Sequence, residues 1–130
     1  MSEKKILGLI EEIHIRNTQD VKESVLAKID TGADNSSIDL TLASQLSLGP
    51  ITKTKNIVSS HGRSIRPVVH LKIEISGVEI EADFTLYNRN HMNYKVLIGK
   101  NILKKGFLID PSKEGPKQKK GTNNVKSSDN

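Results

Sequence analysis

The sequence contains no cysteine and no tryptophan, and its aromatic residues are two phenylalanines and two tyrosines. Without cysteine the chain can form no disulfide, no thiolate zinc site and no cysteine nucleophile. No apolar stretch approaches the length of a membrane span. The N-terminal segment MSEKKILGLIEE has a short apolar run, which Glu11 and Glu12 interrupt before a signal-peptide core is reached. We therefore expect a soluble, cytoplasmic protein that does not associate with a membrane.

Apolar residues are also scarce, at 35% of the 130 residues, and part of this deficit lies at the C-terminus. From Lys113 to Asn130 there is one aliphatic residue and there are five lysines. This segment carries +3 of the total charge of +5, which leaves +2 for residues 1–112. We expect one folded domain over residues 1–112 and a disordered lysine-rich tail over 113–130. We interpret the tail as a segment that increases the solubility of the protein. The alternative is that it makes weak contact with nucleic acid or another polyanion.

Polar and apolar residues alternate along two neighbouring stretches of the chain. The first runs from Val69 to Ile75 and the second from Val78 to Leu86, and Ser76-Gly77 separates them. Alternation with a period of two is typical of strands with one buried face, and a Ser-Gly pair between two such runs predicts a hairpin. In this pattern Glu79, Glu81, Asp83 and Thr85 face solvent.

Shorter apolar segments predict further strands, at 6–15, 25–29, 57–58, 95–98 and 107–109. Two segments have helical character, residues 39–46 with Asp39 or Thr41 as N-cap, and residues 99–106 ending at Gly106. Many short strands with turns between them predict an all-β fold, either a small barrel or a sandwich, with one or two short helices.

The segment Ile29-Asp30-Thr31-Gly32-Ala33 places a carboxylate where a strand ends. Glycine allows the backbone to turn sharply there, and backbone N–H groups beyond the turn can hold the carboxylate in plane. A carboxylate held in this way suits acid–base chemistry on water. The alternative is an ordinary Asx turn, in which Asp30 and Gly32 are needed only for the shape of the turn.

One carboxylate cannot complete the acid–base cycle that hydrolyses a peptide bond, because that cycle needs an ionised and a protonated carboxyl group that share a proton. Asp-Thr-Gly occurs once in this chain. A second Asp30 would have to come from a second copy, and the two-fold axis of a homodimer can pass between the two.

Six short motifs follow one another along the chain: Ala27 to Ala33, Ser59 to Gly62, Arg66-Pro67-Val68, Leu86 to Met92, Leu97-Ile98-Gly99-Lys100 and Phe107 to Ser112. Their order and spacing resemble those of the retropepsin-like aspartic proteases. The resemblance is closer to a microbial branch of that family often labelled ATP-dependent zinc proteases, and it spans roughly residues 6–112. The resemblance implies a small closed acid-protease barrel.

The resemblance also implies roles for individual residues. Asp30 would be the catalytic carboxylate, Thr31 and Gly32 would fix the loop and the dimer contact, and Ala33 would line the cleft floor. Gly99 would brace the catalytic loop from behind. The arginine that follows this glycine in the family is Lys100 here, which keeps the charge but loses the planar fork of donors.

A glycine-bearing hairpin, or flap, closes over the substrate in retropepsins. Chain order assigns this role to a polar tip, which would also contact the substrate, and which consists of Ser59, Ser60, His61, Gly62 and Arg63. The alternative is an ordinary hairpin turn.

Basic residues surround the predicted flap. Arg63 and Arg66, with Lys53 and Lys55 upstream, would make the mouth of the cleft basic. A basic mouth suits an acidic peptide substrate.

The four histidines, His14, His61, His70 and His91, lack the spacing of a His-Glu-x-x-His helix, and we expect no catalytic zinc. Gly99-Lys100 lacks the upstream glycine of a phosphate-binding loop, so we expect no ATP site. No cofactor is predicted.

The function implied by the resemblance is that of an aspartic endopeptidase, which hydrolyses peptide or protein substrates as a homodimer with a pair of Asp30 carboxylates. One alternative is a non-catalytic module of the same fold that binds an extended peptide by strand addition. Others are an accessory partner of an ATP-dependent enzyme, and docking on nucleic acid or ribosomes through the lysine tail.

Overall fold

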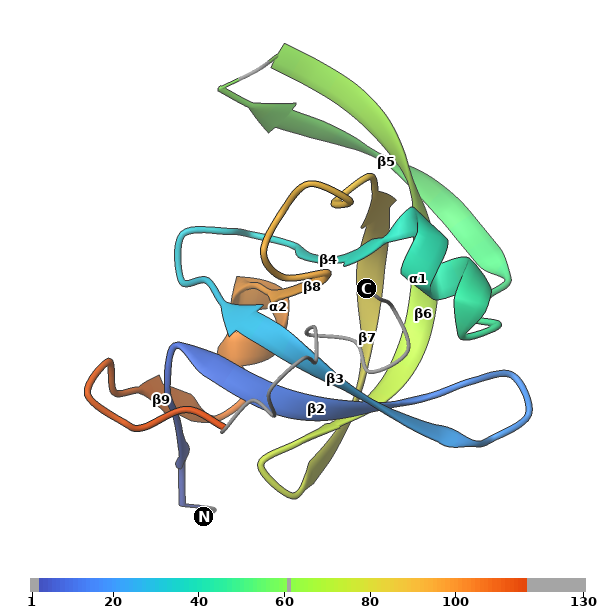
Figure 1. The fold of residues 1–130 in the computed structure, drawn as a ribbon. Helices are drawn as coiled ribbons and strands as arrows, with labels where there is room; N and C mark the ends of the chain where they lie inside the picture. The colour runs from blue at the N-terminus through green and yellow to red at the C-terminus, as the bar shows by residue number, and fades with distance from the viewer. Residues whose placement is uncertain (1–2, 61, 117–130) are drawn as a thin grey trace.

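The computed structural model describes residues 3–60 and 62–116, which form strands with two short helices (Figure 1). In chain order the elements are β1 (Lys5–Leu7), β2 (Ile10–Arg16), β3 (Lys22–Ile29), β4 (Ser36–Asp39), α1 (Leu40–Gln45), β5 (Ile51–Ser59), β6 (Gly62–Ile75), β7 (Val78–Tyr87), β8 (Val96–Ile98), α2 (Lys100–Leu103) and β9 (Phe107–Ile109).

Six of these strands close into a barrel, in the order β2-β3-β8-β4-β7-β6. The seam is the antiparallel pairing of β2 with β6, in which Ile13 lies opposite Ile75 and Ile15 opposite Ile73. β5 pairs with β6 outside the closed ring. The predicted all-β barrel with one or two short helices is confirmed, and the sandwich alternative is not adopted.

The hairpin predicted from the alternating pattern is formed by β6 and β7. Ser76 and Gly77 connect the strands with φ of 51° and 77°, as a type I′ turn requires. β6 begins seven residues before the predicted start, at Gly62, because its first half pairs with β5 rather than covering the core. Thr85, predicted to face solvent, is buried, because β4 lies beside it and the Ser36 carbonyl accepts a hydrogen bond from Thr85 Oγ1 at 3.4 Å.

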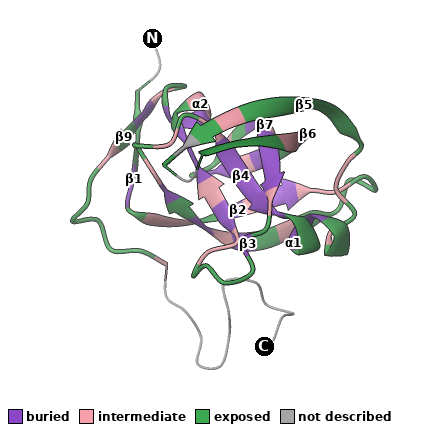
Figure 2. Ribbon diagram, turned by 90° about the horizontal axis from the view of Figure 1, so that it is seen from above, coloured by how far each residue is buried: buried purple, intermediate pink, exposed green. Residues whose placement is uncertain are grey.

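The core fills the inside of the barrel with aliphatic side chains around Phe84, which is fully buried. Figure 2 shows the contrast between the buried barrel strands and the exposed hairpin of β5 and the first part of β6. β5 reads Ile-Thr-Lys-Thr-Lys-Asn-Ile-Val-Ser. It was predicted only at residues 57–58, because polar residues exposed on both faces give no period-two signal.

Both predicted helices form, and both are short. α1 begins after Asp39, whose Oδ2 accepts a hydrogen bond from Leu42 N at 3.1 Å, so Asp39 rather than Thr41 is the N-cap. The structure assigns residues 36–39 to β4, which the sequence pattern did not predict. α2 ends at Leu103, and the turn that follows it passes Gly106 at a φ of 114°.

The predicted strand over residues 6–15 is divided into β1 and β2 by a turn at Gly8 and Leu9. Glu11 Oε2 accepts a hydrogen bond from Gly8 N at 2.7 Å, which stabilises the turn. β1 then pairs in parallel with β9, and this two-stranded sheet lies against the barrel with Leu7 and Phe107 buried.

The last described residues return to the turn between β1 and β2. Lys113 Nζ donates to the Ile6 carbonyl at 3.0 Å and to Glu11 Oε2 at 2.9 Å. Residues 117–130 lie outside the described residues, and the predicted boundary between the domain and a disordered tail stays a prediction. Within residues 3–60 and 62–116, no helix is long and apolar enough to cross a membrane.

Candidate active site

Asp30 lies directly after β3, in the loop that leads to β4. Its backbone N donates to the Ile98 carbonyl at 2.9 Å, which ties the loop to β8. Its Oδ1 accepts a hydrogen bond from Gly32 N at 2.9 Å, and its carbonyl accepts one from Ala33 N at 3.3 Å. These contacts form an Asx turn, and Asp30 remains partly exposed. The loop thus has the geometry of an ordinary Asx turn. Asp30 Oδ2 takes no part in this turn and has no hydrogen-bond partner among the described residues.

Gly99 lies directly behind this loop, at the end of β8. A Cβ atom on Gly99 would lie 2.5 Å from the Asn35 carbonyl oxygen and 2.8 Å from that of Ala33. The φ of Gly99 is −105°, which any residue can adopt, so the requirement for glycine is one of space. The close approach lets Lys100 N donate to Ala33 O at 2.8 Å and Asn101 N donate to Asp34 O at 3.2 Å. That Gly99 supports the catalytic loop, as the resemblance implies, stays a prediction.

A buried serine, which the sequence analysis did not single out, joins the loop to α2. Ser36 Oγ accepts a hydrogen bond from Gly99 N at 2.9 Å and donates one to Asn101 Oδ1 at 2.7 Å. Asn101 Nδ2 donates in turn to the Asp83 carbonyl at 3.0 Å, on β7. Ser36 and Gly99 are 63 positions apart in the sequence, so no local pattern could indicate this contact.

Lys100 forms an ion pair with Asp34 at 3.0 Å, across the same loop. Both side chains are more than half exposed, so the pair contributes at most about 1 kcal/mol. Lysine at this position thus keeps one contact to the Asp30 loop.

The predicted flap coincides with the tip of the β5–β6 hairpin, where Ser59 lies opposite Gly62. His61 lies outside the described residues. Val58 and Ile65 are each 71% exposed, because the outer half of the hairpin extends beyond the barrel (Figures 1 and 2). Whether this hairpin closes over a substrate stays a prediction.

The predicted basic residues separate into different surroundings. Lys55 Nζ donates to Asn35 Oδ1 at 2.7 Å, and the Arg66 guanidinium lies 3.8 Å from the centre of the Tyr87 ring. These two residues lie opposite each other in the β5–β6 register, so they share one face of the hairpin. Lys53 instead pairs with Asp83 at 3.1 Å, and Arg63 lies on the opposite face.

Arg89 was quoted in the sequence analysis only as part of a motif, and the structure buries its side chain in the loop after β7. Its Nε donates to the Tyr94 carbonyl at 3.0 Å. Burial lowers the pKa of Arg89, and the charges of Asp39 and Asp30 act in the opposite direction. A buried basic residue has no distinctive pattern in sequence, because arginine is usually exposed.

His70 lies on the outer face of the barrel, between two carboxylates of β7. Its Nδ1 is 2.9 Å from Asp83 Oδ1 and its Nε2 is 3.1 Å from Glu81 Oε1. The hydrogen bond to Asp83, followed by that to Glu81, raises the pKa of His70. Among the described residues no group of three His, Asp or Glu side chains is arranged to hold a metal ion.

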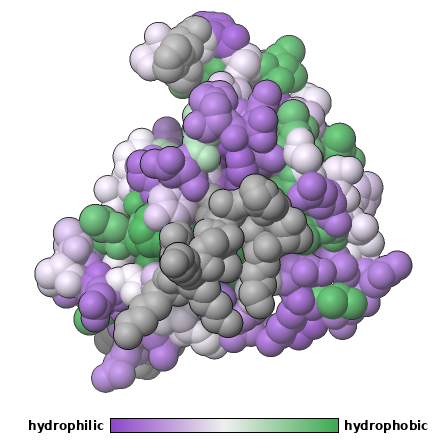
Figure 3. Space-filling model, in the orientation of Figure 1, coloured by the Kyte–Doolittle hydropathy of each residue, from purple (hydrophilic) through white to green (hydrophobic). Residues whose placement is uncertain are grey.

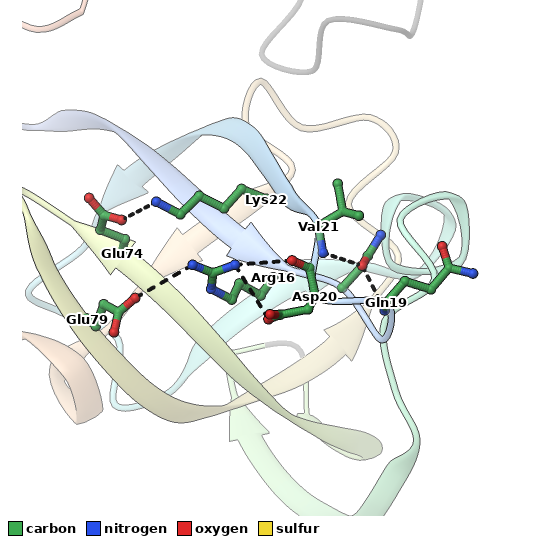
Figure 4. Close-up of polar contacts among 8 residues, drawn as sticks. Arg16, Gln19, Asp20, Val21, Lys22, Glu74 and Glu79 are labelled. Carbon is green, nitrogen blue, oxygen red and sulfur yellow. Dashed lines mark hydrogen bonds and ion pairs between the residues drawn. The ribbon is translucent and has the colours of Figure 1, made fainter.

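A surface pocket of about 420 Å³ lies away from the Asp30 loop, near the β2–β3 and β6–β7 turns. Figure 4 shows that its charged side chains contact one another: Arg16 contacts Asp20 and, at 4.0 Å, Glu79, and Lys22 pairs with Glu74 at 3.0 Å. These pairs account for most of the charge that lines the pocket, so we do not assign it to the candidate active site.

Solved structures with the same fold include retroviral proteases. The chain is similar to a Legionella pneumophila protein of unknown function, with 22% identity and a TM-score of 0.58 over 83% of this chain and 94% of that one. EIAV protease, solved with an inhibitor, matches with 20% identity and a TM-score of 0.56 over 72% and 82% of the two chains. Simian foamy virus protease matches with 18% identity and a TM-score of 0.51 over 72% and 89%.

Two curated relatives, from Shewanella pealeana and Shewanella halifaxensis, bear the name "Probable alpha-L-glutamate ligase". They are 36% and 37% identical over 63 and 59 residues, which are 48% and 45% of this chain. The chain spans 14% and 13% of the length of these relatives.

A family model described as "Retropepsin-like aspartic endopeptidase RimB" matches residues 41–120. The match begins after the Asp30 loop, so it bears on the family and not on that loop. The description names an aspartic endopeptidase and lends no support to the zinc in the label of the microbial branch. Because the family model matches more than half of the chain, the chain belongs to the RimB-like family of retropepsin-like aspartic endopeptidases.

Proposed function

We propose that this protein is an aspartic-type endopeptidase, which hydrolyses peptide bonds with two Asp30 carboxylates brought together in a homodimer. The observation that carries the proposal is the state of the Asp30 carboxylate. One oxygen is held by Gly32 N at 2.9 Å, while the other has no protein partner within the described chain. The close approach of Gly99 to the loop carbonyls, and the hydrogen bonds that Lys100 N and Asn101 N donate to Ala33 and Asp34, are consistent with a loop held in place from behind.

The chemistry follows from sharing one proton between the two carboxyl groups. The ionised Asp30 accepts a proton from a water molecule, whose oxygen attacks the peptide carbonyl carbon, while the protonated Asp30 transfers its proton to the carbonyl oxygen. A tetrahedral gem-diol results. The carboxyl group that took the proton of the water then protonates the amide nitrogen, while the other carboxylate takes a proton from a hydroxyl of the gem-diol. The C–N bond breaks, a carboxylic acid and an amine leave, and the pair again shares one proton.

The substrates proposed are acidic peptides. Lys55 reaches the Asp30 loop through Asn35, and Arg66 lies over Tyr87 at the end of β7, on the same face of the hairpin. Lys53 is neutralised by Asp83 and Arg63 faces the other way, so these two contribute less. A peptide library with no preference for glutamate or aspartate near the cleaved bond would contradict this assignment.

A second candidate function is that of a non-catalytic peptide-binding module that acts beside a larger enzyme. The observation that favours it is the name of the curated relatives, in which the matched region is 14% of a protein called a glutamate ligase. In this case the barrel binds a peptide and leaves it intact.

Replacement of Asp30 by asparagine distinguishes the two functions. We expect Asp30→Asn to reduce cleavage of a peptide library, followed by mass spectrometry, to background, while the thermal unfolding midpoint stays near that of the parent. Asp20→Asn is the matched control, because Asp20 lies at the far end of the barrel with a φ of 64°, which asparagine tolerates. Equal cleavage by the parent and Asp30→Asn would rule out the mechanism.

A further inference from the structure

Arg89 is a buried cation without an ion-pair partner among the described residues, and the charge of Asp30, the proposed catalytic carboxylate, acts on it. The residue is 7% exposed. Taking a charge out of water costs several kcal/mol unless hydrogen bonds or an opposite charge compensate, so a buried and unpaired guanidinium needs an explanation.

The loop after β7 holds Arg89 in one position. Arg89 N donates to Asp39 Oδ1 at 2.7 Å, and the Arg89 carbonyl accepts a hydrogen bond from Met92 N at 2.9 Å. The side chain is anchored by its Nε, which donates to the Tyr94 carbonyl at 3.0 Å. A guanidinium with its Nε fixed in this way is oriented before any ligand arrives.

The other end of the guanidinium has no hydrogen-bond partner in the described part of the chain. Nη1 and Nη2 of Arg89 form no hydrogen bond with any residue that the structure describes. In the described part of the chain, Ser37 Oγ is the one side-chain polar atom that is both fully buried and without a partner. Nη1 and Nη2 of Arg89 also have no partner, so neither of them can be fully buried. Each of these two nitrogens therefore keeps some contact with solvent, although the residue as a whole is buried.

The charges around Arg89 leave its positive charge incompletely balanced. Asp39, the acid whose charge acts most strongly on Arg89, uses Oδ2 to cap α1 and Oδ1 to accept the Arg89 backbone N–H. Asp30 also attracts the guanidinium, whereas Arg66 repels it. Arg66 lies over Tyr87, two residues before Arg89, so two cations border the same region at the end of β7.

We propose that Arg89 is a specificity-determining residue, whose two free Nη donors bind a carboxylate of the bound peptide near Asp30. A carboxylate matches the planar fork of donors with two parallel hydrogen bonds. The carboxylate comes either from a glutamate or aspartate side chain or from the C-terminus of the peptide. The proposal rests on the proposed function in that it places a peptide over Asp30, and it holds for a binding module as well.

The experiment measures binding rather than cleavage. Fluorescent peptides of one sequence, with glutamate or glutamine at the same positions and with a free or amidated C-terminus, are titrated with the full chain carrying Asp30→Asn, so that no peptide is consumed. We expect the carboxylate peptides to bind at least about tenfold more tightly than their neutral counterparts, since hydrogen bonds to charged groups are worth that much. The pair of peptides that shows the preference identifies the source of the carboxylate.

Adding Arg89→Gln should reduce this preference to about onefold. The carboxylate peptide should bind more weakly, and the affinity for its neutral counterpart should stay unchanged. Arg89→Lys keeps the charge, serves as the second variant if Arg89→Gln fails to fold, and should retain a reduced preference. Lys72→Gln is the matched control, since it removes one positive charge from the outer face of β6 and should retain the full preference.

Equal affinity of the Asp30→Asn chain for carboxylate and neutral peptides would overturn the proposal. So would an Arg89→Gln variant that binds both kinds of peptide equally more weakly, since that pattern indicates a structural role. Cleavage by the parent chain is assayed separately. If the preference for carboxylate peptides is intact but the parent chain cleaves no peptide, the role of Arg89 is supported and the proposed catalysis is contradicted. If the parent chain cleaves peptides but shows no such preference, the proposed catalysis is supported and the role of Arg89 is contradicted.

Discussion

At the scale of single residues, contact distances decide the role of each side chain around the Asp30 loop. Gly99 shows this most clearly. The residue adopts an ordinary backbone conformation, yet a methyl group there would approach two carbonyl oxygens to within 2.5 and 2.8 Å. Either the loop that carries Asp30 or the end of β8 would have to move.

We therefore expect Gly99→Ala to lower the free energy of unfolding by about 1–3 kcal/mol, the usual cost of overpacking. The same variant should lose most of its peptidase activity, because displacement of the loop moves Asp30. Chemical denaturation and a peptide cleavage assay measure the two effects. Gly115→Ala is the control, since its Cβ would lie 3.5 Å from the nearest atom, and we expect a change within about 0.5 kcal/mol. A Gly99→Ala variant as stable and active as the parent would show that the loop adapts.

At the scale of secondary-structure elements, the sequence predicted best where each element has its own periodicity. The β6–β7 hairpin was predicted because alternating residues and a Ser-Gly turn lie within one short segment. β4 and most of β5 were not predicted, because neither has an alternating pattern. All four residues of β4 are buried, and the first six residues of β5 are exposed. β4 and β5 form strands because they pair with neighbouring strands, and the neighbours of β4 are distant in sequence.

The pairing of β6 with β7 also predicts a dependence of stability on pH. His70 lies opposite Asp83 in the register, and the pKa of His70 is raised chiefly by Asp83, then by Glu81. A raised pKa in the folded state means that the stabilisation is fully present below the ordinary histidine pKa of about 6.5 and is lost as the pH rises through the raised value. Because these side chains are about half exposed, we expect an effect below about 1 kcal/mol.

Denaturation at about pH 6 and about pH 8.5 measures this effect, with His70→Gln as the reference. The parent should lose more stability than His70→Gln between the two pH values. Parallel curves for the two proteins would indicate that the His70 contacts do not contribute in solution. The pKa of Asp83 is lowered, chiefly by His70, so its stabilisation is present above about pH 4 and lost in more acidic solution.

At the scale of the whole molecule, the central feature is that a closed barrel carries one Asp30 and the proposed chemistry needs two. On the face shown in Figure 3, hydrophobic surface is divided into small patches between hydrophilic ones. Exposed apolar side chains occur both on the terminal sheet, at Ile6 and Leu108, and on the hairpin, at Val58 and Ile65. A second copy therefore has apolar surface to bind at more than one place.

If the active species is a homodimer, activity per chain must depend on protein concentration. We expect activity per chain to be constant above the dissociation constant of the dimer and to fall in proportion to concentration far below it, because dissociation separates the two Asp30 carboxylates. Sedimentation velocity over the same concentrations measures the fraction of dimer. Activity that stays constant where sedimentation reports only monomer would contradict the shared site.

The sequence by itself determined the fold class, the barrel hairpin and the order of motifs that leads to the family, because these depend on residues that are neighbours in the chain. Tertiary structure alone decided the insertion of β8 between β3 and β4, the contact of Gly99 with the Asp30 loop, and the burial of Arg89. The physical reason is that each of these depends on the register and packing of segments distant in sequence. A pattern within one segment reports which face it buries, but not what lies against that face.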